Sequence, residues 1–320
     1  MLKTKSEISE KFLNLFRNNL VFLLLILIFI IFSLKIPGFF AKQNFDNISR
    51  QMTTLGLLST GMTLAIIAGG IDLSVGAILA LSITIGGLAI KNGYSLEIVY
   101  PLVIISSLFM GFINGFFISK LKAPPIIVTL GTMNVFRGIA MVITNGKWVS
   151  PIPPEFLIVG KSYIPFLTLA VVFIIFIIIN TFWKFGRNLY AIGGNEIAAS
   201  FSGVPVVKYK FFIYLISAFL SAIAGIIFVG RSGFIQPQVG IGYEMDAIAA
   251  VVVGGTSIWG GSGSIARTVL GTFFISIILN GLTMLGVNPY WKDAFIGGLI
   301  LLAISIDSIR FLSEKSNIRI

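Results

Sequence analysis

The sequence contains no cysteine and no histidine among its 320 residues. The chain therefore has no disulfides, thiol nucleophiles, histidine general bases or Cys/His ligands for metals. Charge is scarce too, because Asp, Glu, Lys and Arg make up 11% of the chain, whereas soluble domains carry about 25%. With a mean hydropathy of +0.99, the composition predicts an all-α polytopic membrane protein. We expect no metal and no cofactor.

The net charge of +11 is best explained by the excess of Lys and Arg in cytoplasmic loops, and not by binding of nucleic acid. Residues 1–19 form a basic leader ahead of an apolar run, and that run is long for a signal peptide. No small-residue cleavage site follows it. We expect residues 1–19 to lie in the cytoplasm and the run to be an uncleaved first span.

Ten segments are long and apolar enough, or nearly so, to cross a bilayer, which takes about 20 residues. The predicted spans are 20–35, 46–69, 73–91, 98–119, 125–144, 163–183, 208–230, 244–258, 264–285 and 291–309. This topology predicts one transmembrane domain over 20–309, a cytoplasmic tail over 310–320 and cytoplasmic termini. Eight spans remain possible if 46–69 and 244–258 are re-entrant.

The stretch AGGIDLSVGAILALS is unusually polar and glycine-rich for this chain. We interpret Gly69, Gly70, Asp72, Ser74 and Gly76 as a structural turn between two spans. The glycines supply permissive dihedral angles and close packing. We expect the carboxylate of Asp72 to cap the helix that begins near residue 73, in preference to contacting cargo.

A weak internal repeat aligns GGIDLSVG at 69–76 with GGTSIWGG at 254–261. In the ten-span topology both copies lie on the same membrane side and run in the same direction. Glycine-interrupted segments at corresponding places of two halves point to the functional centre of a transporter. A chance likeness between two glycine-rich turns remains the alternative.

Polar residues within predicted spans are costly, so they are candidates for a translocation path. These candidates are Thr129, Thr132, Asn134, Arg137 and Asn280. Arg137 lies near the middle of its span and could hydrogen-bond a hydroxylated solute. Alternatively, it forms an ion pair with a carboxylate such as Asp246 or Asp293 that serves folding alone.

The tripeptide Gly160-Lys161-Ser162 imitates the end of a Walker A motif. That motif requires a glycine five residues before its Gly-Lys pair, and Glu155 occupies that position. We therefore expect no ATP hydrolysis by this chain. The energy for transport must come from a partner subunit or an ion gradient.

The loop 184–207 is the longest basic cytoplasmic segment of the topology. It is predicted to turn at Gly193–Gly194, after which Asn195 caps a short helix over 196–201 that ends before Gly203. A small-sided helix between two spans could dock against a partner. The alternative is a solvated loop with a fragment of interfacial helix.

Five motifs, in order, resemble the permease subunits of bacterial ribose-type ABC importers. They read GMTLAIIAGGIDLSVGAILALS, VTLGTMNVFRGIAMVITNG, FGRNLYAIGGNEIAASFSG, GYEMDAIAAVVVGGTSIWGGSGSIARTVLGT and NGLTMLGVNPYWKDAFIGGLILLAISID. Together they cover about residues 50–307. Trp259 and Arg267 depart from the usual family pattern, at positions that do not define the family.

The resemblance implies an importer for a monosaccharide such as a ribose-like pentose or a hexose, in the bacterial cytoplasmic membrane. It also implies a cytoplasmic ATP-binding subunit, an extracytoplasmic sugar-binding protein and a second permease copy, identical or not. The residues it assigns to coupling with the ATPase are Gly193, Gly194, Asn195, Glu196, Ala198, Ala199 and Gly203. Alternatives are an ABC permease for a nucleoside, a quorum-signal furanose or a branched amino acid, or an ion-coupled carrier.

Overall fold

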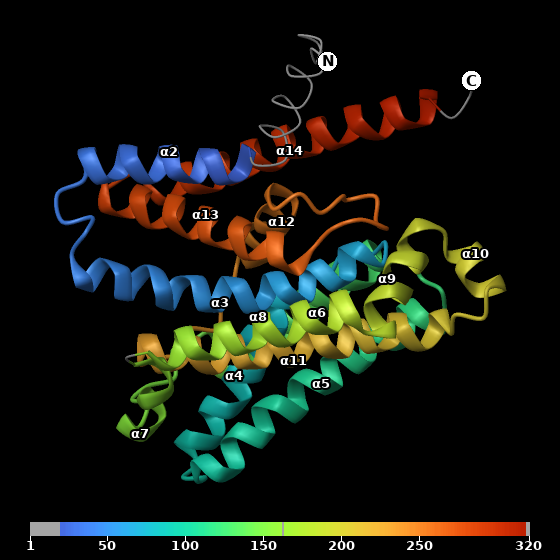
Figure 1. Ribbon diagram of the computed structural model, residues 1–320. Helices are drawn as coiled ribbons and strands as arrows, with labels where there is room; N and C mark the ends of the chain where they lie inside the picture. Colours follow the sequence, from blue (N-terminus) through green and yellow to red (C-terminus); the bar gives the residue numbers. More distant parts are fainter. Residues whose placement is uncertain (1–19, 162, 318–320) are drawn as a thin grey trace.

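The computed structural model describes residues 20–161 and 163–317. Its long helices run roughly alongside one another, with α10 at one end of the bundle and α7 at the opposite end (Figure 1). The helices are α2 (Leu20–Lys35), α3 (Lys42–Ile67), α4 (Val75–Lys91), α5 (Leu96–Ser119), α6 (Pro125–Thr144), α7 (Pro154–Leu157), η1 (Ile158–Gly160), α8 (Ile164–Phe182), α9 (Lys184–Gly194), α10 (Glu196–Phe201), α11 (Val206–Ser232), α12 (Tyr243–Val253), α13 (Ile265–Met284) and α14 (Pro289–Asn317). In these described ranges the only β-pairing is an isolated antiparallel bridge between Val149 and Ile235.

The all-α prediction is confirmed, and each predicted span coincides with a helix. For the span 125–144, predicted and observed helix have the same first and last residues. By contrast, α12 is shorter than its predicted span and α14 is longer. Among the described residues, α5, α6, α8, α11 and α13 are long and apolar enough by themselves to cross a membrane. The remaining spans are shorter or more polar, so the number of crossings stays a prediction.

One prediction about the loop 184–207 is wrong. The chain does not turn at Gly193–Gly194 but stays helical from Lys184 to Gly194, and the helix breaks at Asn195. Leu189 and Ile192 of this helix are buried in the main core. Glycine is less favourable than alanine inside a helix by about 1 kcal/mol per residue. Burial of these apolar side chains outweighs that cost.

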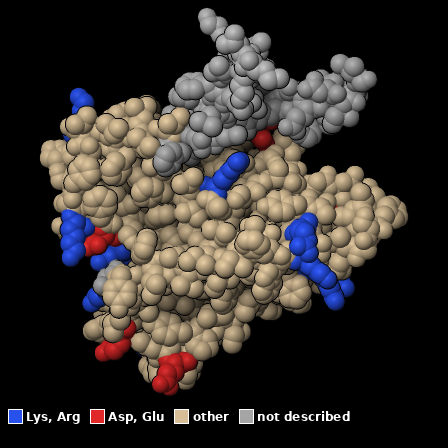
Figure 2. Space-filling model, in the orientation of Figure 1, with Lys and Arg blue, Asp and Glu red and all other residues tan. Residues whose placement is uncertain are grey.

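Helix α11 occupies the centre of the bundle, packed against α3, α4 and α5. A glycine makes the contact with α5 close, because a Cβ on Gly111 would lie 2.7 Å from the carbonyl oxygen of Tyr214. By contrast, α6 has the smallest buried share among the five apolar spans. On the face in Figure 2, most charged side chains lie toward the two ends of the bundle, with uncharged surface between them. That distribution fits a membrane-spanning bundle.

Candidate functional site

Asp72 ties the glycine-rich turn to the centre of the bundle. Its Oδ1 accepts hydrogen bonds from the amide (3.0 Å) and hydroxyl (2.6 Å) of Ser74, and its Oδ2 accepts one from the hydroxyl of Ser217 at 2.7 Å. Asp72 therefore holds the turn, but the expectation that it caps the following helix is wrong. The capping position is Ser74, and the carboxylate is directed to Ser74 and to Ser217 of α11.

The same network continues into α5 and α6. Asn114 donates to the Ser74 hydroxyl at 2.8 Å, and the hydroxyl of Thr132 donates to the Asn114 amide oxygen at 2.7 Å. The hydroxyl of Thr129 lies 2.9 Å from the carbonyl oxygen of Pro125 in its own helix and 3.2 Å from that of Ile71 in the turn. Two candidate path residues, Thr129 and Thr132, are thus engaged in holding the turn against α6.

The outer face of α6 is open and mostly apolar, with Leu130, Val135 and Val142 exposed on it. Asn134 is exposed, and its amide nitrogen donates to the carbonyl of Leu130 in its own helix at 2.9 Å. A Cβ added to Gly131 or to Gly138 would meet no atom within 4 Å. Gly131, Asn134 and Gly138 form a narrow stripe on this face, and Asn134 is its one polar side chain; a polar side chain within a span normally faces protein or water.

Arg137 lies between the two faces of α6 and reaches the segment 233–242, which connects α11 to α12. One guanidinium nitrogen lies 3.0 Å from the carbonyl oxygen of Gly240 and 3.4 Å from a carboxylate oxygen of Glu244. The other lies 3.5 Å from the carbonyl of Val239. An ion pair with a carboxylate was one of the two alternatives for Arg137, and the carboxylate is neither of the two named as examples. Arg137 pairs with Glu244, while Asp246 pairs with a lysine of α14.

Asn280 lies in a separate contact. Its amide nitrogen donates to the Asn44 side chain at 2.9 Å, which joins α13 to α3. Asn44 in turn donates to the carbonyl of Phe39 at 2.9 Å. The structure therefore does not gather the five candidate path residues at one site: Thr129 and Thr132 face the turn, Asn134 is exposed, and Arg137 contacts the segment 233–242. Asn280 contacts α3.

The two glycine-rich repeats meet in space at the end of α9. The amide of Gly261 donates to the carbonyl of Ile67 at 2.9 Å. A Cβ on Gly260 would lie 3.0 Å from the Cα of Gly69, and one on Gly261 would lie 2.8 Å from the Cα of Gly194. Only glycines allow backbones to approach this closely. The paired glycines were the visible signal, but sequence alone did not indicate that they contact one another.

The short helix predicted over 196–201 is confirmed residue for residue as α10. Asn195 is its N-cap, and the side-chain oxygen of Asn195 accepts a hydrogen bond from the Ala198 amide at 3.0 Å. Gly203 follows the helix with a φ of +82°, a conformation that favours glycine. Glu196 forms an ion pair with Lys210 of α11, which fixes the helix to the bundle.

The two sides of α10 differ in what they contact. Ala199 faces the bundle and is buried. Ile197 and Phe201, four residues apart, are 70% and 89% exposed. Residues at this spacing share one helical face, so they form an apolar pair that projects from the end of the molecule. Sequence reasoning missed this pair because it concentrated on the small residues.

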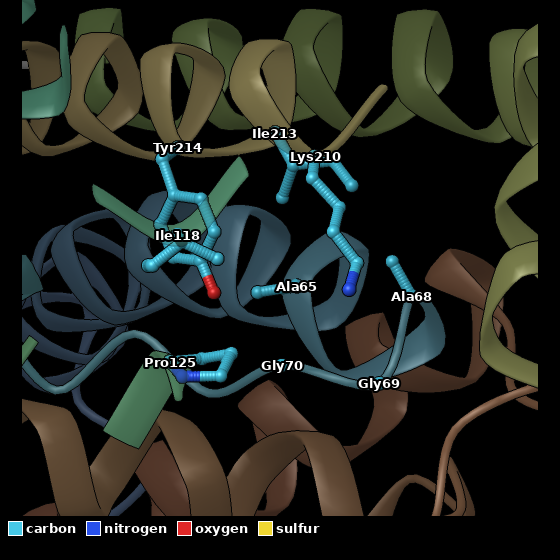
Figure 3. A pocket seen from close by; sticks show the side chains of 9 residues that line it. All are labelled: Ala65, Ala68, Gly69, Gly70, Ile118, Pro125, Lys210, Ile213 and Tyr214. Atoms are coloured by element: carbon cyan, nitrogen blue, oxygen red, sulfur yellow. The ribbon is translucent and has the colours of Figure 1, made fainter. Parts of the chain in front are cut away.

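A small pocket lies beside the Asp72 turn, between α11 and the chain at Gly69 and Gly70. Figure 3 shows Lys210 and Tyr214 reaching from α11 toward the chain at Gly69 and Gly70. A Cβ on Gly70 would lie 2.6 Å from the Tyr214 hydroxyl. The lysine that holds Glu196 of α10 therefore also borders the turn, and these two features are adjacent.

Comparison with known families assigns the chain to one of them. Residues 44–304 match the family described as branched-chain amino acid transport system / permease component. The chain belongs to this permease family. No solved structure matches the chain.

The permease is also similar to individual curated proteins. The ribose import permease protein RbsC of Bacillus subtilis (strain 168) is 42% identical over 89% of this chain and 91% of that protein. RbsC of Haemophilus influenzae is 38% identical over 90% and 92%. The autoinducer 2 import system permease protein LsrC of Escherichia coli O157:H7 is 36% identical over 92% and 88%. With its apolar helices and bacterial relatives, the permease is a multi-pass protein of the bacterial cytoplasmic membrane.

Proposed function

We propose that this permease is the transmembrane subunit of an ABC importer that moves a monosaccharide, a ribose-like pentose or a hexose, into the cytoplasm. The observation that carries the proposal is α10, a capped helix that projects an apolar pair from one end of a membrane bundle. The similarity to two ribose permeases over about nine-tenths of each chain supports the choice of cargo. The autoinducer 2 permease supports a furanose-type signal molecule as the second candidate.

The end of the bundle that carries α10 is assigned to the cytoplasm. Lys120, Lys122, Lys184 and Lys208 lie at this end, between or beside the spans, as the positive-inside rule requires. With α10 inside, the ten-span topology puts both termini in the cytoplasm.

Coupling to a separate ATP-binding subunit is assigned to α10. Ile197 and Phe201 would insert into an apolar groove of that subunit, since exposed apolar pairs on a projecting helix mark protein contacts. The residues predicted from the sequence take supporting roles in this proposal. Asn195 and Gly203 shape the ends of the helix, Glu196 anchors it, and Ala199 packs it against the bundle. Gly193 and Gly194 join it to the glycine-rich repeats.

The path for the solute is assigned to the exposed face of α6. Asn134 presents an amide there, and glycines on both sides leave space beside it. We infer that a second permease copy faces this stripe and encloses a polar passage. A binding protein outside the membrane would deliver the sugar to that passage.

The experiment is ATP-driven uptake of labelled ribose into proteoliposomes that contain the permease, its ATPase and its binding protein. Phe201→Glu is expected to reduce both uptake and co-purification of the ATPase at least about tenfold, because a buried unpaired charge costs several kcal/mol. Ile158→Glu is the matched control, since Ile158 is 55% exposed at the opposite end. Undiminished ATPase binding by Phe201→Glu would refute the coupling assignment. Uptake of an autoinducer 2 analogue in place of sugars would favour the second candidate.

A further inference from the structure

The segment 233–242 runs between α11 and α12 without regular secondary structure. Val239 and Gly240 of this segment are buried. Within a bilayer, non-helical backbone must find hydrogen-bond partners in the protein or in water. Arg137 provides them, because its guanidinium donates to the carbonyl oxygens of both residues. One side chain of α6 therefore holds the inner part of this segment.

Helix α4 closes on the segment from another side. A Cβ on Gly76 would lie 2.9 Å from a carboxylate oxygen of Glu244 and would collide with the carbonyl of Gly240. Gly240 and Gly242 have φ values of +76° and +85°. The contact is formed by backbone atoms and by the Glu244 carboxylate, and glycine at Gly240 and Gly242 lets the backbone of the segment change conformation at little steric cost.

The other end of the segment is attached more firmly. Val149 and Ile235 exchange two backbone hydrogen bonds of 2.9 and 3.1 Å. Next to them, the rings of Trp148 and Phe234 stack with centroids 4.9 Å apart. Since residues 148–149 closely follow α6, the segment is attached to α6 and its continuation at two places.

The two attachments differ in strength. Around Arg137, two of the three contacts measure 3.4 and 3.5 Å, and its side chain and that of Glu244 remain 17% and 11% exposed. Hydrogen bonds near 3.5 Å are weak, since ordinary charge-assisted pairs measure 2.7–2.9 Å. Partial exposure also lets water or a solute hydroxyl replace either partner. By contrast, the two hydrogen bonds between Val149 and Ile235 have ordinary lengths of 2.9 and 3.1 Å, and a stacked ring pair lies beside them. The contacts of Arg137 are therefore the weaker attachment of the segment, and they are suited to release.

We propose that the Arg137–Glu244 pair is a releasable tie, and that the segment 233–242 must part from α6 at this point for solute to pass. The bridge between Val149 and Ile235 then serves as the hinge. This inference rests on the proposed transport function, because Arg137 lies one turn from Asn134 of the assigned path.

The first test measures leakage without ATP. Vesicles containing the permease with its ATPase are loaded with a labelled neutral polyol, and its efflux is followed. Arg137→Gln and Glu244→Gln are expected to raise efflux about tenfold to a hundredfold, which corresponds to the loss of a hydrogen bond to a charged group. The matched controls are Asp246→Asn and Lys292→Gln, which disrupt the neighbouring pair on the same end of α12. Unchanged efflux in both tie variants, or an equal rise in the controls, would overturn the proposal.

The second test uses the natural absence of cysteine in the chain. Arg137→Cys combined with Glu244→Cys is expected to leak, and a short, reducible bifunctional thiol reagent should then stop both the leak and ATP-driven uptake. Reduction should restore the leak. A disulfide introduced through Val149→Cys and Ile235→Cys should leave uptake intact, because that end is the hinge. Uptake that persists with the first pair crosslinked would overturn the release step.

These outcomes separate the tie from the proposed function. The leak is measured with a polyol and requires no knowledge of the cargo. If the wild-type complex imports no sugar but the tie variants leak as expected, the sugar assignment fails and the tie stands. If sugar uptake is normal and the tie variants do not leak, the tie alone fails.

Discussion

Replacement of Asp72 by alanine should destabilise the permease more than any other single polar substitution within the Asp72 network. Asp72 is fully buried and accepts three hydrogen bonds of 2.6 to 3.0 Å. Hydrogen bonds inside membrane proteins contribute on average about 0.6 and at most about 1.7 kcal/mol each. Loss of all three therefore corresponds to about 2–5 kcal/mol, before any cost of the space left by the carboxylate.

The substitutions form a graded series. Ser217→Ala removes one of the three bonds and should cost about 0.6–1.7 kcal/mol. Asp72→Asn keeps the shape and one acceptor oxygen, so its cost should lie between those of Ser217→Ala and Asp72→Ala. Asp46→Ala is the matched control, because Asp46 is exposed on α3 and should change the free energy of unfolding by less than about 0.5 kcal/mol.

The assay is reversible unfolding of the purified permease in mixed micelles, followed by helix content. Limited proteolysis in native membranes gives a second readout, since a loosened turn exposes backbone to protease. The reasoning would be refuted if Asp72→Ala unfolded within about 0.5 kcal/mol of wild type. It would also be refuted if Ser217→Ala cost as much as Asp72→Ala, because the network would then depend on the serine rather than on the carboxylate.

Two further substitutions test close packing and the role of Asn280. Gly76→Ala should cost about 1–3 kcal/mol, because the new methyl group collides with the backbone of Gly240. Gly131 has open space around it, so Gly131→Ala should be neutral or stabilise the protein by up to about 1 kcal/mol. The midpoint of thermal unfolding distinguishes the two variants, and equal effects would contradict the packing argument. Asn280→Leu should lower stability by about 1 kcal/mol through loss of its bond to Asn44, yet leave the KM of uptake unchanged in the folded fraction. A raised KM would instead indicate that Asn280 contributes to the translocation path.

Local patterns predicted most of the helices. The segment 125–144 begins at a proline suited to the first helical position and ends at an asparagine in the left-handed conformation, Asn145, so both of its ends follow from residue type. The helix α10 was equally predictable, because Asn195 caps it and Gly203 follows it. By contrast, α9 was missed, since its stability comes from burial of Leu189 and Ile192 in the bundle.

The partners of charged residues were harder to predict from the sequence than the helices were. An ion pair with a carboxylate was one of two alternatives for Arg137, and residue type alone does not distinguish Glu244, Asp246 and Asp293 as its partner. Only the path of the segment 233–242 brings Glu244 to α6. In the same way, aspartate is a residue type that commonly caps helices. Only the position of α11 brings Ser217 to the second carboxylate oxygen of Asp72.

The sequence by itself determined that the chain is a helical membrane permease, because hydropathy, helix ends and ordered family motifs are properties of local stretches. It also determined the short helix that we assign to coupling. The tertiary structure alone decided that Ile197 and Phe201 project outward, that the two glycine-rich repeats touch, and that Arg137 secures a non-helical segment through Glu244. Those relations join residues as far as 194 positions apart, Ile67 and Gly261. The energy that selects them comes from packing and hydrogen bonding between helices, which no local pattern encodes.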